Sequence, residues 1–223
     1  SKLRSNLLFS ARFFDSYLQS KLNETPDPYF VILGSASYYL CDLPGSASVL
    51  AKWINGDCPD LGGDGLENLL LWLLQGNFRT NFDGSEGLFG RIIDEISKGI
   101  LRFFEAGKGE GNLLELATEL RESVYDFGTP RQLLFGDVIA AVLRKKLENS
   151  VWKALPSYSG LPSGKWFQVL QKDSFIKEFW PAQHLLGKAD VFKGKSAIIQ
   201  MPTSAGKTKA TELILRSAFL AER

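Results

Sequence analysis

Apolar residues recur at intervals of three and four along the first two thirds of the chain. This spacing places them on one face of a helix. The plainest case runs from residue 3 to residue 22, where the stripe consists of Leu7, Leu8, Ala11, Phe14, Leu18 and Leu22. The same pattern, interrupted by short Gly, Pro, Asn and Asp segments, predicts further helices over residues 29–43, 46–54, 66–75, 87–105, 112–125 and 130–149. We therefore expect an all-α domain over residues 1–155.

The pattern changes after residue 150. Residues 151–164 combine aromatic side chains with Pro156, Pro162 and Gly160, which predicts an irregular junction between two units. Helical spacing returns over residues 165–180, and Pro181 suits the first turn of another short helix that reaches Leu186.

The next apolar run is too short for a helix. Ala197, Ile198 and Ile199 form a partly β-branched run that predicts a buried strand, and Pro202 ends it. A helical pattern then begins at Lys207. Residues 156–223 are therefore expected to form a second domain, and the expected fold class of the whole chain is mainly α.

Charge is unevenly distributed, although the net charge is only +1. Residues 1–143 carry 12 Lys and Arg against 19 Asp and Glu, whereas residues 144–223 carry 14 against 6. The basic part is suited to the phosphates of a nucleotide or a nucleic acid. Attraction between the two parts of the chain would explain the same asymmetry, and the sequence leaves both interpretations open.

Composition excludes several classes of protein. Cys41 and Cys58 are too few for a disulfide scaffold or a zinc cluster, so we expect buried free thiols in a reducing compartment. Neither a membrane-spanning run nor a signal peptide is recognisable, which predicts a cytoplasmic protein without a membrane partner.

Residues 202–208 carry the most specific chemistry in the chain. A loop at a helix N-terminus offers free backbone N–H groups to a polyphosphate. Lys207 would reach the terminal phosphates of ATP, and the Thr208 hydroxyl would bind Mg²⁺. The expected cradle consists of Pro202, Thr203, Ser204, Ala205, Gly206, Lys207 and Thr208. Met201 occupies the position where the general phosphate-loop pattern has its first glycine.

That departure is itself informative. Met-Pro-Thr-Ser-Ala-Gly-Lys-Thr, residues 201–208, resembles the first motif of superfamily-two helicases of the DEAD/DEAH-like kind, which lacks the leading glycine. Phe179-Trp-Pro-Ala-Gln183 is similar to the aromatic-x-Pro-x-Gln segment upstream of that motif. The resemblance implies that Gln183 hydrogen-bonds the adenine edge and that Phe179 or Trp180 helps to form its pocket. His184, the lone histidine, is expected to make a structural bond or to face solvent, and no role is assigned to it.

The resemblance covers residues 175–223 and implies a RecA-like α/β lobe of which this chain holds the start. The magnesium-binding acidic motif and the arginine finger of that family would follow Arg223, so hydrolysis of ATP by this chain alone is expected to be negligible. We therefore expect the N-terminal portion of an ATP-dependent DNA or RNA helicase, which binds nucleic acid as the full-length protein. A helicase-type motif after a long helical region also resembles the helicase of bacterial antiphage systems of the Hachiman type.

Two alternatives from other classes remain open. The acidic balance of the helical region disfavours direct binding to a phosphate backbone, so that region is equally interpreted as a module that binds a protein partner. A nucleotide-binding protein of another phosphate-loop class is the second alternative.

Overall fold

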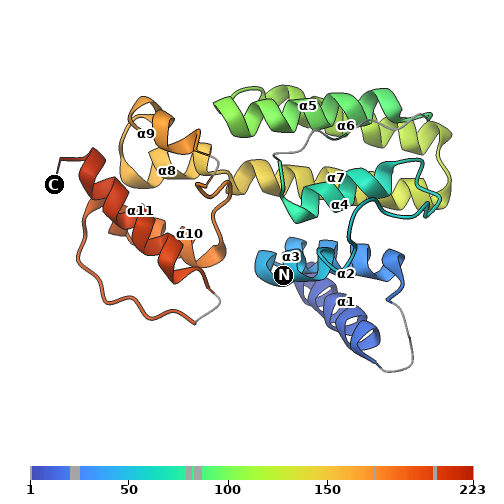
Figure 1. Cartoon of the computed structure of the whole chain (residues 1–223), viewed down its shortest axis with the longest axis horizontal. Coiled ribbons are helices and arrows are strands. Elements are labelled where there is room, and N and C mark those ends of the chain that lie inside the picture. The colour runs from blue at the N-terminus through green and yellow to red at the C-terminus, as the bar shows by residue number, and fades with distance from the viewer. Residues whose placement is uncertain are drawn as a thin grey trace. The chain divides into compact units, whose positions relative to one another are not determined.

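A computed structural model of the chain describes residues 2–20, 26–78, 82, 87–172, 174–202 and 205–222. The described residues are mainly helical and include no strand (Figure 1). In chain order the elements are α1 (Lys2–Gln19), α2 (Pro28–Leu40), α3 (Pro44–Ala51), α4 (Leu66–Gln75), α5 (Gly90–Ala106), α6 (Glu110–Phe127), α7 (Pro130–Asn149), α8 (Val151–Ser159), α9 (Ser163–Leu170), α10 (Pro181–Lys188), the 3₁₀ helix η1 (Val191–Lys193) and α11 (Lys207–Leu220).

The chain divides into two compact units. Unit 1 comprises residues 1–101 and 109–145, and unit 2 comprises residues 102–108 and 146–223. The boundary after residue 145 therefore lies earlier in the chain than the one predicted after residue 155. The last residues of α5 and of α7 belong to unit 2.

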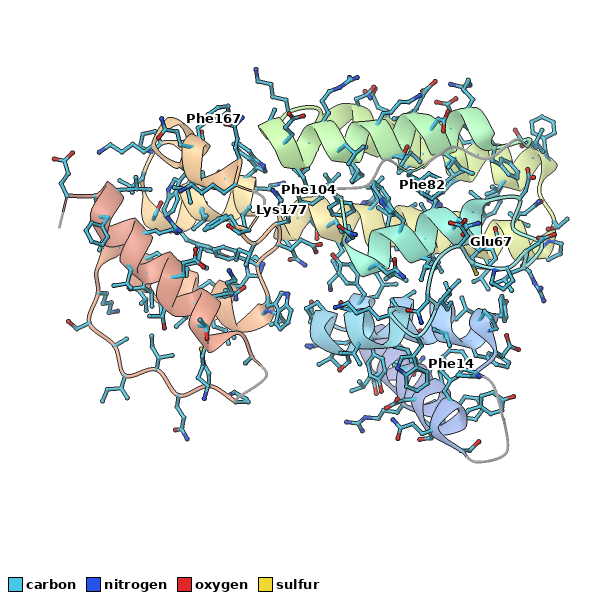
Figure 2. The ribbon with its side chains drawn as sticks, in the orientation of Figure 1. Phe14, Glu67, Phe82, Phe104, Phe167 and Lys177 are labelled. Carbon is cyan, nitrogen blue, oxygen red and sulfur yellow. The ribbon has the colours of Figure 1, made fainter. Side chains whose placement is uncertain are left out.

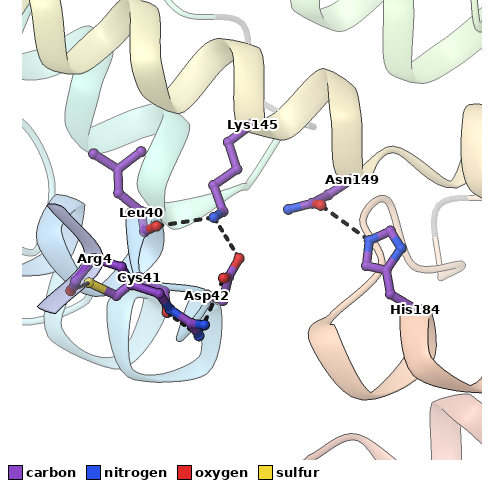
Figure 3. A network of polar contacts seen from close by, with 7 residues as sticks. All are labelled: Arg4, Leu40, Cys41, Asp42, Lys145, Asn149 and His184. Atoms are coloured by element: carbon purple, nitrogen blue, oxygen red, sulfur yellow. Dashed lines mark hydrogen bonds and ion pairs between the residues drawn. The ribbon is translucent and has the colours of Figure 1, made fainter. Parts of the chain in front are cut away.

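Unit 1 contains the predicted helical domain. Helix α2 packs against α1, α3 and α4. Phe14 of α1, labelled in Figure 2, stacks on Phe30 of α2 at 5.7 Å between ring centroids. Asp27 starts α2, since its carboxylate accepts a hydrogen bond from the Tyr29 N–H at 2.9 Å. At the other end of α2, Lys145 Nζ donates to the Leu40 carbonyl and pairs with Asp42 (Figure 3).

Unit 2 is built around one apolar cluster. Helix α8 packs against α9, α10 and η1, and α11 packs against η1. Trp166, Phe179 and Phe192 are almost fully buried in the cluster. The polar atoms that enter it are paired: Trp166 Nε1 donates to Ser159 Oγ at 3.0 Å, and Ser217 Oγ donates to the Phe192 carbonyl at 2.5 Å. These bonds avoid the cost of burying an unpaired polar group.

Two secondary-structure predictions in unit 2 were wrong. The segment predicted as an irregular junction forms α8, because Ser150 caps the Trp152 N–H and one face of the helix buries Val151, Ala154 and Leu155. This burial outweighs the hydrogen bond that Pro156 cannot make. Conversely, the helix predicted over residues 165–180 ends at Leu170, because the next part of the chain pairs with the start of α8 instead.

The strand predicted at residues 197–199 is also absent. These residues belong to no helix or strand, and Ile198 is 103% exposed and Ile199 41%. A strand is stabilised by backbone hydrogen bonds to a neighbouring strand, and the described part of the chain offers none. The apolar run is therefore left in solvent.

Candidate nucleotide site

The predicted loop meets a helix where the sequence places it. Gly206 has φ +81° and directly precedes α11, whose first residue is Lys207. This left-handed backbone conformation favours glycine, because a side chain would be strained there. The first N–H groups of α11 have no partner within the helix and, with the positive end of its dipole, favour an anion.

Lys207 and Thr208 are exposed at this helix start. Both line an open, shallow surface that continues along one face of α11 as far as Phe219. All of its lining residues come from α11, so neither Gln183 nor Phe179 faces it. Of the remaining cradle residues, Pro202 is exposed and its carbonyl accepts a hydrogen bond from the Ala205 N–H at 3.1 Å. Thr203 and Ser204 lie outside the described residues.

Gln183 and Gly206 lie in contact, although 22 residues separate them in the chain. A Cβ atom placed on Gly206 would lie 3.1 Å from Gln183 Nε2 and 3.8 Å from Trp180 Cε3. The structure thus brings the Phe179–Gln183 segment against the glycine that precedes Lys207. A larger residue at position 206 would displace the Gln183 amide.

Gln183 is 2% exposed. Its Oε1 accepts a hydrogen bond from the Trp180 N–H at 2.6 Å, so the side chain caps the helix that carries it. The amide NH₂ group is the part of Gln183 that faces Gly206.

Phe179 is a core residue, 1% exposed. Its ring stacks on Tyr158 at 6.0 Å and 20° and meets His184 edge-on at 5.5 Å. The partly buried Trp180, rather than Phe179, is therefore the aromatic residue of this segment that lies beside Gly206.

The segment that carries Phe179 and Gln183 is held by the residues that join α7 to α8. Phe179 N–H donates to the Asn149 carbonyl at 2.8 Å, and Val151 N–H donates to the Lys177 carbonyl at 3.1 Å. Beside them, Lys146 pairs with Glu178 at 2.5 Å, and the Lys146 side chain is only 2% exposed. Sequence reasoning missed this pair because no local pattern links residues so far apart.

A second group of charges lies on α11 itself. The Glu212 carboxylate accepts hydrogen bonds from Lys209 Nζ and Arg216 Nε, each at 3.0 Å. Burial raises the pKa of Glu212, but these two bonds and the positive charges outweigh it, so the net pKa is lowered. Lys209 also donates to the Ser174 carbonyl at 3.4 Å, which fastens α11 to the segment after α9.

Comparisons with protein-family models, with curated proteins and with solved structures found no match to this chain. Among the described residues, no three of His, Cys, Asp and Glu gather as the ligands of a metal ion would. No helix in the described ranges has both the length and the apolar character that crossing a membrane requires.

Proposed function

We propose that unit 2 carries the ATP-binding part of an ATP-dependent helicase or translocase of the superfamily-two kind, in a RecA-like lobe. The observation that supports this best is the contact between Gln183 and Gly206. Two segments that resemble helicase motifs are separated in sequence, and they meet at the N-terminus of one helix.

The residues at the start of α11 are suited to binding a nucleoside triphosphate. Gly206 allows the backbone to turn into α11, and Lys207 and Thr208 extend from its first turn into solvent. In the proposed complex, the Lys207 ammonium binds the β- and γ-phosphates and the Thr208 hydroxyl binds Mg²⁺. Backbone N–H groups from Ser204 to Lys207 complete the cradle. Trp180 lies beside Gly206, where it would contact the adenine, and the buried Gln183 amide would hold Gly206 in place.

Binding of a fluorescent ATP analogue with Mg²⁺ to the whole chain tests this proposal. Removing the ammonium with Lys207→Ala should weaken binding at least about ten-fold, because a charged partner of the phosphates is lost. Lys172→Ala is the matched control, since Lys172 is exposed in the same unit and lies outside the loop and α11. Equal affinity of the Lys207→Ala variant and the original chain for ATP would refute the assignment.

The acidic helical region of residues 1–143 supports a second proposal, that its helices bind a protein partner. Residues 1–143 have seven more acidic than basic residues, which disfavours a phosphate backbone as their ligand. Fluorescence anisotropy of labelled single-stranded DNA, titrated with this chain, distinguishes binding to nucleic acid from binding to a protein partner. Tight, salt-sensitive binding by this chain would favour a nucleic-acid role, and its absence would favour a protein partner.

A further inference from the structure

His184 makes two hydrogen bonds with its ring, each to a different helix. Nε2 lies 3.1 Å from Asn149 Oδ1, at the end of α7, and Nδ1 lies 3.0 Å from the Tyr158 hydroxyl, in α8 (Figure 3 shows the bond to Asn149). Because Asn149 presents an oxygen, Nε2 is assigned as the donor of that bond, and in the neutral imidazole Nδ1 then accepts from the Tyr158 hydroxyl. The imidazole therefore joins α10 to two other elements of unit 2.

Both partners of His184 are themselves fixed. A Cβ atom on Gly187, one turn after His184 in α10, would lie 2.3 Å from the Tyr158 ring, so α10 and α8 are in close contact. Asn149 uses its backbone carbonyl to hold the Phe179 N–H at 2.8 Å and its side chain to hold His184. One residue thus fixes the segment before α10 as well as its first turn.

We propose that His184 is a positioning residue of the nucleotide site, which sets the rotation of α10 and thereby holds Gln183 against Gly206. The two residues are neighbours on a helix of eight residues, about 100° apart around its axis. A bond that fixes the direction of one therefore fixes the direction of the other. The consequence for ATP binding rests on the proposed function, whereas the positioning is measurable without nucleotide.

The test compares hydrogen exchange at the Trp180 amide, whose N–H is bonded to Gln183 Oε1, with affinity for the fluorescent ATP analogue. His184→Phe keeps an aromatic ring beside Phe179 and removes both hydrogen bonds. We expect Trp180 exchange to accelerate at least about ten-fold, and ATP binding to weaken by about the same factor, because two hydrogen bonds between partly buried groups are lost. Tyr158→Phe, which removes only the hydroxyl, should give a smaller change in the same direction.

Two variants separate positioning from general destabilisation. His184→Gln retains a donor and an acceptor and should recover most of the protection and the affinity. Leu185→Ala alters an exposed residue of the same helix and should change neither. Exchange that accelerates equally at Leu213 in α11 would show loss of stability throughout unit 2 and overturn the inference.

Two further outcomes separate failure of the inference about His184 from failure of the proposed function. Unchanged exchange at Trp180 in the His184→Phe variant would overturn the inference even if the chain binds ATP. Absence of ATP binding by the unsubstituted chain would instead refute the proposed function, while the exchange measurements would still decide whether His184 holds Gln183.

Discussion

The Lys146–Glu178 pair offers a sharp stability test, because it ties the end of α7 to the segment that leads to Gln183. We consider Lys146→Met, which keeps most of the buried aliphatic stem and removes the ammonium. The Lys146 side chain is 2% exposed and that of Glu178 is 15% exposed, so the carboxylate left behind is largely shielded from water.

Removing one partner of a buried pair costs about 3–5 kcal/mol, because the remaining charge loses the attraction of that partner. We expect a loss of about 3 kcal/mol for Lys146→Met, at the lower end of that range. The partial exposure of Glu178 allows water to approach the carboxylate and recovers part of the cost.

Urea unfolding followed by tryptophan fluorescence measures this change in the free energy of unfolding, and hydrogen exchange in α8 and α10 assigns it to unit 2. Lys98→Met is the control, since Lys98 pairs with Asp94 on the surface of α5, where the side chains are 69% and 37% exposed. It should change stability by less than about 0.5 kcal/mol. A loss equally small for Lys146→Met would refute the reasoning.

Three further outcomes follow from individual side chains. The lowered pKa of Glu212 stabilises the folded chain above the ordinary value of 4.5, so the difference in unfolding free energy between this chain and Glu212→Gln should shrink as the pH falls below that value. Burial, together with the charge of Glu67, raises the pKa of Cys58 to about 12, so mass spectrometry should find it unalkylated by iodoacetamide in the folded chain and alkylated in urea. Ile198→Ser should leave the urea midpoint unchanged, because Ile198 makes no buried contact; a loss above about 1 kcal/mol would show that it is packed.

Sequence was most informative where local chemistry decides the structure. Helix α7 begins at Pro130 and ends at Asn149, as predicted, because its start is set by neighbouring residues. The Thr129 hydroxyl accepts from the Gln132 N–H, while Gln132 Oε1 accepts from the Thr129 N–H. This reciprocal arrangement lies within four residues and is readable from the sequence. The mainly helical character of the chain is likewise confirmed.

The predicted secondary structure was wrong where contacts between residues far apart in the chain decide the conformation. Residues 171–180 have apolar spacing suited to a helix, yet Lys177 and Phe179 bond to the junction of α7 and α8. Ile198 and Ile199 have the side chains of a strand, but strand formation depends on a pairing partner that periodicity cannot reveal. For the candidate site, the motif identified Gly206 and Gln183 separately, whereas their contact and its support by His184 required the fold.

The residues that follow the proposed phosphate loop are packed against the rest of unit 2, whereas Ile198, which precedes it, is exposed. This difference affects the affinity for a ligand. On the side of α11, Gly206 lies against the Gln183 amide, which α10 and the end of α7 hold through His184. On the other side, Ile198 has no packing partner. Binding is weakened by every group that a ligand must order. Affinity for a polyphosphate should therefore depend chiefly on Lys207 and the start of α11.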